Sequence, residues 1–219
     1  MQTPAMTSNA RIFAWGTRAL YLGPVFNLSA HRVGVAAFCC GVSGEMEVAR
    51  DPRRPDKGFV ACRSLLIPAG ALHLVRFNAP PLACLYLDPQ SDDVQKAAAA
   101  MRRNTHALAT AHSSEKEIIG LLDAAARNKL APDRLHQQLT ALLDLAGPLQ
   151  RDERVARVVA RMRDAPGAAH PLAALARDVG LSESRLQHLF KTCTGVPLRR
   201  FRIWNRMGTA IGMAAAGAS

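Results

Sequence analysis

The hydrophobic positions of this chain follow one pattern in its first ninety residues and another in the rest. Short apolar runs separated by Gly, Pro and Asn extend from about residue 11 to residue 87, which is typical of β-strands. The predicted strands are Val33–Cys40, Glu45–Ala49, Phe59–Ile67, Leu72–Phe77 and Leu82–Leu87, with a polar turn over Arg50–Gly58. Strands this short at this spacing predict a small antiparallel barrel or sandwich.

Beyond residue 90 the apolar residues recur at helical spacing. An alanine-rich segment over 91–110 predicts one helix, and segments that open at Ser113 and Pro132 predict two more. A fourth helix opens at Asp152, and its apolar stripe is Val155, Val158, Val159 and Met162. The pattern predicts an α+β chain. Residues 1–90 form the barrel, 91–150 a helical connector or dimerising hairpin, and 151–219 an all-helical domain.

Residues 171–193 meet the physical needs of two helices that cross through a tight turn. Pro171 suits a first helical turn, and Ala176 is small where the helices approach most closely. Gly180 suits a turn position with positive φ, and Ser182 suits the N-cap of the second helix. This is the spacing of a helix-turn-helix, although an ordinary helical hairpin has the same apolar period. The apolar inner faces are Leu172, Leu175, Val179, Leu186, Leu189 and Phe190.

This part of the chain reads PLAALARDVGLSESRLQHLFKTCTGVPLRRFRIWNRM. Its L-A-x-x-V-G-x-S-x-x-x-L pattern, its H-L-F-K run and its T-G-V-P-L-R-R-F-R segment resemble the AraC/XylS family of transcription regulators over residues 151–213. The resemblance implies that the second helix lies in the major groove of double-stranded DNA. The residues that then face base edges are Ser184, Gln187 and His188. Those near the sugar–phosphate backbone are Arg185, Lys191 and Thr192, and Ser182 stands at the start of the same helix.

The chemistry of these side chains is consistent with those roles. Gln187 can pair with adenine through two hydrogen bonds, and His188 can donate to guanine. Arg185 and Lys191 can bind phosphates, which fixes the register without reading sequence. Two alternatives stay open, since Arg185 could pair with Asp178 and His188 could be a plain surface histidine.

Charge and cysteine usage narrow the class further. The net charge is +11, of which residues 151–219 carry +7 and the first 150 residues +4, so the basic surplus favours a polyanionic partner for the last third. The five cysteines form no C-x-x-C pair and are odd in number, which argues against a disulfide framework or zinc finger and for a reducing cytoplasm. Neither a signal peptide nor a membrane span is expected.

A further helix is predicted after Pro197. Its expected core residues are Phe201, Trp204 and Ile211, and its positive surface comprises Arg199, Arg200, Arg202 and Arg206. In the AraC/XylS family this helix links two helix-turn-helix units. Here the sequence ends where the second unit is expected to begin, so the expectation is either an engineered or natural truncation or a chain that uses one reading head per subunit.

The segment Ile67–Asn78, IPAGALHLVRFN, is similar to the second motif of the cupin barrels. Metal-binding cupins also need an H-x-H pair, but Val33 stands two residues after His31, so no metal, no other cofactor and no catalysis are expected. His31 and His73 are instead candidates for contacts with a small-molecule effector, or are structural histidines. The adjacent Cys39 and Cys40 point to opposite faces of a strand and are expected to be buried small hydrophobes rather than a redox sensor.

The leading hypothesis is therefore a sequence-specific DNA-binding transcription regulator that acts as a homodimer and responds to a small-molecule effector. One alternative is a cupin-type metalloenzyme with a helical tail. Another is a shortened dimerisation partner that does not read DNA by itself.

Overall fold

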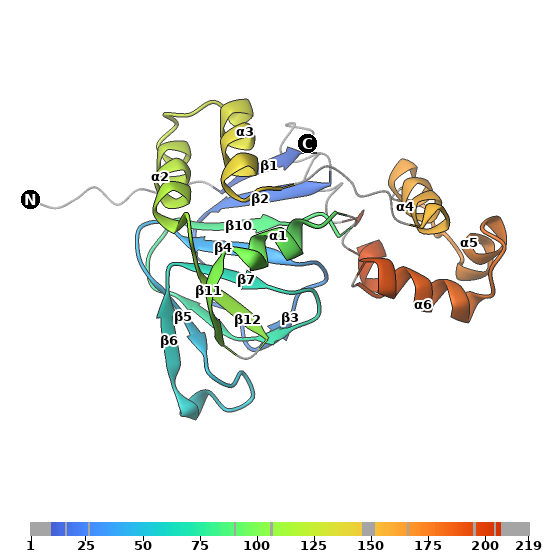
Figure 1. Ribbon diagram of the computed structural model, residues 1–219, viewed down its shortest axis with the longest axis horizontal. Coiled ribbons are helices and arrows are strands. Elements are labelled where there is room, and N and C mark those ends of the chain that lie inside the picture. Colours follow the sequence, from blue (N-terminus) through green and yellow to red (C-terminus); the bar gives the residue numbers. More distant parts are fainter. Residues whose placement is uncertain are drawn as a thin grey trace, which may run out of the picture.

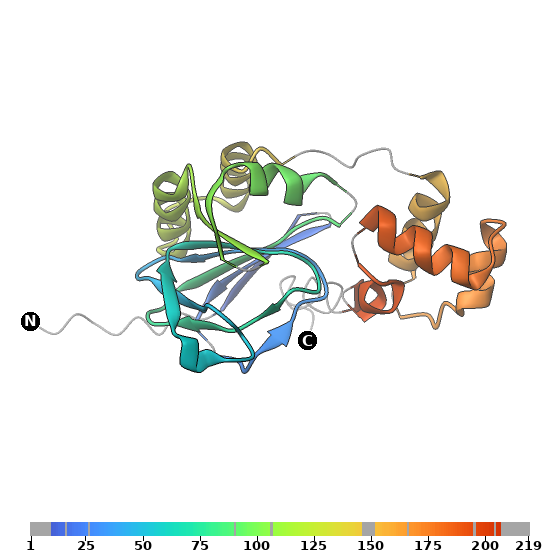
Figure 2. The same ribbon diagram turned by 60° about the horizontal axis from the view of Figure 1, so that its bottom comes forward.

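The computed structural model describes residues 10–15, 17–25, 27–89, 91–105, 107–145, 152–165, 167–194, 196–203 and 205–206. They form a layered sheet domain with a group of helices beside it (Figures 1 and 2). Trp204 and Ile211, two of the expected core residues, lie outside the described residues.

The sheet domain is built on one antiparallel sheet of seven strands. Its strand order is β1 (Arg11–Trp15), β2 (Arg18–Gly23), β10 (Leu82–Tyr86), β4 (Ala37–Gly41), β7 (Ser64–Ile67), β12 (Leu108–His112) and β11 (Met101–Thr105). Strands β1, β2, β11 and β12 were not among those predicted from the sequence.

Two smaller sheets cover one face of this large sheet. One has the order β6 (Phe59–Cys62), β5 (Met46–Ala49), β9 (Val75–Phe77), and the other pairs β3 (His31–Arg32) with β8 (Leu72–His73). The predicted turn over Arg50–Gly58 contains one 3-10 turn, Pro55–Lys57. None of the three sheets closes on itself within the described strands, so the fold is α+β as predicted but the closed barrel is not confirmed.

Strand β4 shows why this region reads as an unbroken apolar run. Ala37 and Cys39 face the core shared with the small sheets, and Phe38 and Cys40 face the core shared with the helices. Successive side chains of a strand point to opposite faces, so a strand that is covered on both sides must be apolar throughout. The prediction that Cys39 and Cys40 face opposite ways is confirmed.

Helices α1 (Asp93–Ala99), α2 (Glu115–Ala126) and α3 (Pro132–Leu142) pack on the other face of the large sheet (Figure 1). The buried residues that α2 and α3 contribute to that core include Ile118, Leu122, Leu135 and Leu139. The predicted start of α3 at Pro132 is confirmed, and α2 begins two residues after the predicted Ser113. The pair is therefore fixed to the sheet by its apolar face.

The prediction of a single helix over residues 91–110 is wrong. The helix ends at Ala99, and the chain continues as the hairpin β11–β12. Thr110 of β12 is the register partner of Leu65 in β7, and Leu108, Thr110 and His112 are buried. This pairing outweighs the helical propensity of the alanines, because propensities are small compared with tertiary packing.

The remaining helices are α4 (Glu153–Asp164), α5 (Leu172–Asp178) and α6 (Glu183–Thr194), followed by helical residues at 198–203 and 205–206. We call this group the head. The predicted stripe of α4 is buried in its core, where the rings of Phe190 and Phe201 meet edge to face at 5.3 Å. Among the described helices, none combines the length and the apolar character needed to cross a bilayer.

The head lies against one end of the sheet domain (Figures 1 and 2). Val35, in the loop before β4, is fully buried within the core of the head, and Tyr86 of β10 packs against that core. An oxygen of Asp88 lies 3.7 Å from a guanidinium nitrogen of Arg163 in α4. Apolar and charged contacts thus join the head to the sheets.

Candidate nucleic-acid interface

The turn between α5 and α6 has the geometry that the sequence predicts. Gly180 has φ of +66°, a conformation that L side chains adopt only with strain. The backbone N–H of Leu181 donates to the carbonyl of Ala176 at 2.9 Å, and Ala176 is only 2% exposed. The small buried Ala176 and the positive φ of Gly180 therefore allow the two helices to cross closely through a tight turn.

Helix α6 presents one buried and one exposed face. The hydroxyl of Ser182 accepts the backbone N–H of Arg185 at 3.3 Å, which confirms Ser182 as the N-cap. Leu186 and Phe190 are fully buried beneath the helix. The opposite face is exposed and polar.

Four of the residues predicted to contact DNA share this exposed face. Ser184, Gln187, His188 and Lys191 follow the i, i+3, i+4, i+7 spacing of one helical face, and all four are exposed. They line one open groove together with Leu172, Pro197, Leu198, Arg199 and Arg202. All of these lining residues belong to the head.

Arg199 and Arg202 were predicted only as general positive surface. Their position in the groove follows from the helical segment after Pro197, which brings residues three apart onto the same side. The guanidinium of Arg202 also donates to the carbonyl of His170, and burial lowers its pKa. The i, i+3 spacing of the two arginines indicates that they share one helical face. That this face lines the groove depends on how the segment folds against α6, which the spacing does not show.

The structure does not bring the other three predicted residues into the groove. Ser182 caps the helix, and Arg185 is exposed beside it. Asp178, the alternative partner considered for Arg185, pairs with Arg161. Thr192 lines a different hollow, between the head and sheet-domain residues such as Ala36 and Asp88.

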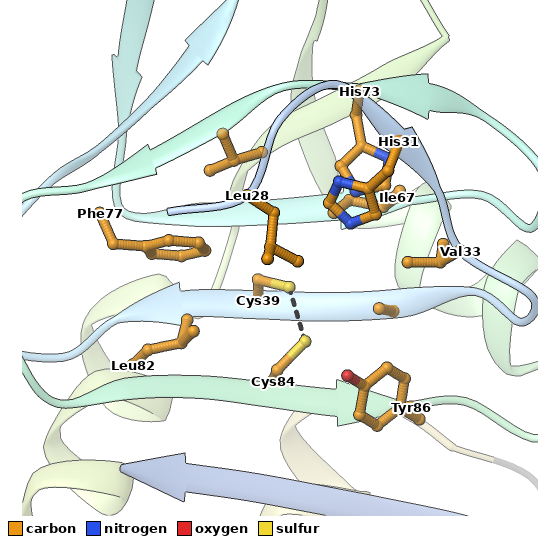
Figure 3. Close-up of a pocket in the computed structure, with 12 residues that line it drawn as sticks. Leu28, His31, Val33, Cys39, Ile67, His73, Phe77, Leu82, Cys84 and Tyr86 are labelled. Carbon is orange, nitrogen blue, oxygen red and sulfur yellow. Dashed lines mark hydrogen bonds between the residues drawn. The ribbon is translucent and has the colours of Figure 1, made fainter. Parts of the chain in front are cut away.

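The two candidate effector-binding histidines lie together in the sheet domain. His31 and His73 are register partners in β3 and β8, with ring centroids 4.3 Å apart (Figure 3). Their Nδ1 atoms lie 2.8 and 2.9 Å from the carbonyl oxygens of Ser29 and Ala71, so each Nδ1 carries a proton and donates to a carbonyl.

Both histidines line a cavity whose empty space is about 520 Å³, part of it open to solvent. Its walls are mainly apolar, and its other lining residues are Leu28, Val33, Ala37, Cys39, Ile67, Val75, Phe77, Leu82, Cys84 and Tyr86 (Figure 3). Over the described part of the chain, no three His, Cys, Asp or Glu side chains gather so that they could hold a metal ion.

Burial lowers the pKa of His73 below its ordinary value of 6.5. The unfolded chain then binds more protons than the folded chain below about pH 6.5, so the free energy of unfolding falls as the pH drops through that value. We expect the urea midpoint to be lower at about pH 5.5 than at about pH 7.5. Burial lowers the pKa of His112 and His136 in the same direction. His73→Gln should narrow the difference between the two midpoints, and equal midpoints in the unmodified chain would contradict the prediction.

The chain matches no protein-family model and no curated protein. Solved structures similar to it include the AraC-like transcriptional activator CuxR, at 12% identity, with 93% of this chain and 80% of that chain covered and a TM-score of 0.40. An apo variant of ToxT from Vibrio cholerae is 9% identical, with 91% of this chain and 83% of that chain covered and a TM-score of 0.49. Wild-type ToxT from Vibrio cholerae with a bound unsaturated fatty acid is 9% identical, with 99% and 84% covered and a TM-score of 0.45.

Proposed function

We propose that this chain is a DNA-binding transcription regulator of the AraC type, and that α6 enters the major groove. The observation that carries the proposal is the exposed face of α6, where Ser184, Gln187, His188 and Lys191 line one groove with two arginines. The major groove of B-DNA admits an α-helix, and helix-turn-helix proteins read bases with this element. The sequence resemblance of residues 151–213 supports the same function.

The groove divides the proposed work between two kinds of contact. Gln187 and His188 lie on the exposed face of α6 and carry the amide and imidazole groups that read base edges. Lys191, Arg199 and Arg202 add positive charge along the same groove, where they would bind phosphates and fix the register. Arg185 and Thr192, which lie outside the groove, are assigned to phosphates at its edges.

The remaining parts of the proposal concern control and assembly. The cavity lined by His31 and His73 is the proposed site for a small, largely apolar effector. Residues 1–90, 91–150 and 151–219 are the proposed sensing, connecting and DNA-binding regions. A homodimer would place two heads on two half-sites, and since α2 and α3 bury their apolar faces on the sheet, their outer faces would form its contact.

The test is to replace Gln187 by alanine and measure binding to a duplex selected by the unmodified chain from a random library. Loss of a bidentate contact should weaken binding by about 1–3 kcal/mol, or roughly 5- to 150-fold in Kd. The loss of sequence preference should be confined to one base pair of the selected duplex, because the other contacts to the duplex remain.

The matched control is Asn104→Ala, which removes the same carboxamide group at an exposed position of β11, outside the groove and outside α2 and α3. This variant should bind like the unmodified chain. Equal weakening by Gln187→Ala on every duplex would contradict base reading. If the unmodified chain formed no salt-dependent complex with any duplex, the DNA-binding proposal itself would be wrong, and a dimerisation partner would be favoured instead.

A further inference from the structure

Two cysteines that are far apart in the sequence meet inside the cavity of the sheet domain. Cys39 of β4 and Cys84 of β10 are direct register partners, and their sulfur atoms lie 3.0 Å apart (Figure 3). The sequence drew attention to Cys39 and Cys40, but Cys40 faces the opposite core. The pair that can react together is therefore Cys39 and Cys84.

The geometry of this pair is suited to a disulfide. Register partners in antiparallel strands have Cα atoms about 4.5 or 5.5 Å apart, and disulfides span about 4.4–6.8 Å between Cα atoms. The sulfurs would have to approach by about 1 Å to reach the length of an S–S bond. Rotation about the side-chain bonds is enough for that, so the strands can stay paired.

The surroundings of the pair restrict which reagent can reach it. Both sulfurs line the cavity, whose neighbouring walls are the apolar side chains of Leu28, Phe77 and Leu82 (Figure 3). Cys84 is partly exposed, whereas Cys39 is only 2% exposed. A reagent therefore meets Cys84 first, and the walls favour one with an apolar body.

Hydrogen bonding and burial act on Cys39 and on the neighbouring Tyr86. A hydrogen bond to Cys84 and then burial raise the pKa of Cys39 well above its ordinary range. The neighbouring Cys84 and then burial raise the pKa of Tyr86, whose hydroxyl hydrogen-bonds to Cys84. Cys39 and Tyr86 thus keep their protons. Cys39 therefore remains a thiol, while Cys84 is the sulfur that a reagent in the cavity meets first.

We propose that Cys39 and Cys84 form a dithiol site that is oxidised by organic hydroperoxides with an apolar body. The sulfur of Cys84 attacks the terminal oxygen of the O–O bond, which breaks; the alcohol leaves with a proton, and Cys84 becomes a sulfenic acid. The thiol of Cys39 then attacks that sulfur, and the S–O bond breaks as water leaves. In total two thiols and one hydroperoxide give one disulfide, one alcohol and one water, so the hydroperoxide takes up two electrons.

This site goes beyond the proposed DNA binding and does not rest on it. The other cysteines are poor competitors for the same reagent. Burial raises the pKa of Cys62 to about 12, and Cys40 is buried in the other core. Cys193 lies on α6 in the head, away from the cavity.

The test is to treat the fully reduced chain with one equivalent of cumene hydroperoxide and to count the thiols by alkylation and intact mass. We expect the five thiols to fall to three, with a peptide map that joins Cys39 to Cys84. Hydrogen peroxide at the same concentration should oxidise the pair more slowly, because it lacks an apolar body. A chain that keeps all five thiols, a different cross-link, or faster oxidation by hydrogen peroxide would overturn the proposal.

Two variants separate the roles of the sulfurs. Cys39→Ala should leave a sulfenic acid on Cys84 that dimedone traps, whereas Cys84→Ser should abolish both the cross-link and the trapped adduct. The matched control is Cys193→Ser, which should still lose two thiols to the cross-link. The thiol count of the unmodified chain is decisive even where a variant folds poorly.

Discussion

Replacing Phe190 by alanine is expected to lower the free energy of unfolding of the head by about 3–5 kcal/mol. Phe190 is fully buried on the inner face of α6, and its ring meets that of Phe201 at 5.3 Å. The same core holds residues of α4 and α5, so the cavity left by the ring would loosen every helix of the head. Urea denaturation followed by far-ultraviolet circular dichroism measures the loss.

The control for this prediction is Gln187→Ala, an exposed substitution on the opposite face of the same helix. It should change the free energy of unfolding by no more than about 0.5 kcal/mol, because exposed positions away from caps and cores contribute little. A loss below about 1 kcal/mol for Phe190→Ala would show that the packing of α6 described above is wrong.

Replacing Asp93 by alanine should destabilise the sheet domain by a similar amount, about 3–5 kcal/mol. Both oxygens of Asp93 accept hydrogen bonds from the guanidinium of Arg18, each at 2.7 Å. One of them also accepts the backbone N–H of Asp88 at 3.1 Å, and Asp93 is fully buried. Without the carboxylate, a largely buried guanidinium loses two hydrogen bonds and a buried N–H loses one.

The matched control is Asp123→Ala, which removes the carboxylate of an i, i+4 pair with Arg127 on the surface of α2. Exposed helical pairs of this kind contribute about 0.3–0.5 kcal/mol, so the two variants should differ severalfold in urea denaturation. Similar losses for both variants would contradict a special role for the buried pair.

The head could be predicted from the sequence almost residue by residue. Its turn depends on local features, since Gly180, Ser182 and Ala176 act within a few residues of their own positions. The buried stripe of α4 likewise follows from periodicity alone. The place of Thr192 could not be found in this way, because it depends on how the head packs against the sheets.

The sheet domain was predicted less completely, because its pairings join distant segments. The sequence of the hairpin β11–β12 predicts a helix, because the pairing of Thr110 with Leu65 in β7 is not visible in the local pattern. The cupin-like motif indicated His73, but the contact between His31 and His73 depends on the register of β3 and β8. Cys84 drew no attention in the sequence, since its partner Cys39 lies 45 residues away.

Tyr86 belongs at once to the wall of the cavity and to the packing against the core of the head. Under the proposed function, a compound whose affinity depends on the position of this ring would change the affinity of the head for DNA by some factor. By thermodynamic linkage, DNA would change the affinity for that compound by the same factor. The amount of available operator would then shift the concentration of the compound that gives a response. The number of target sites in the cell would therefore help to set that concentration.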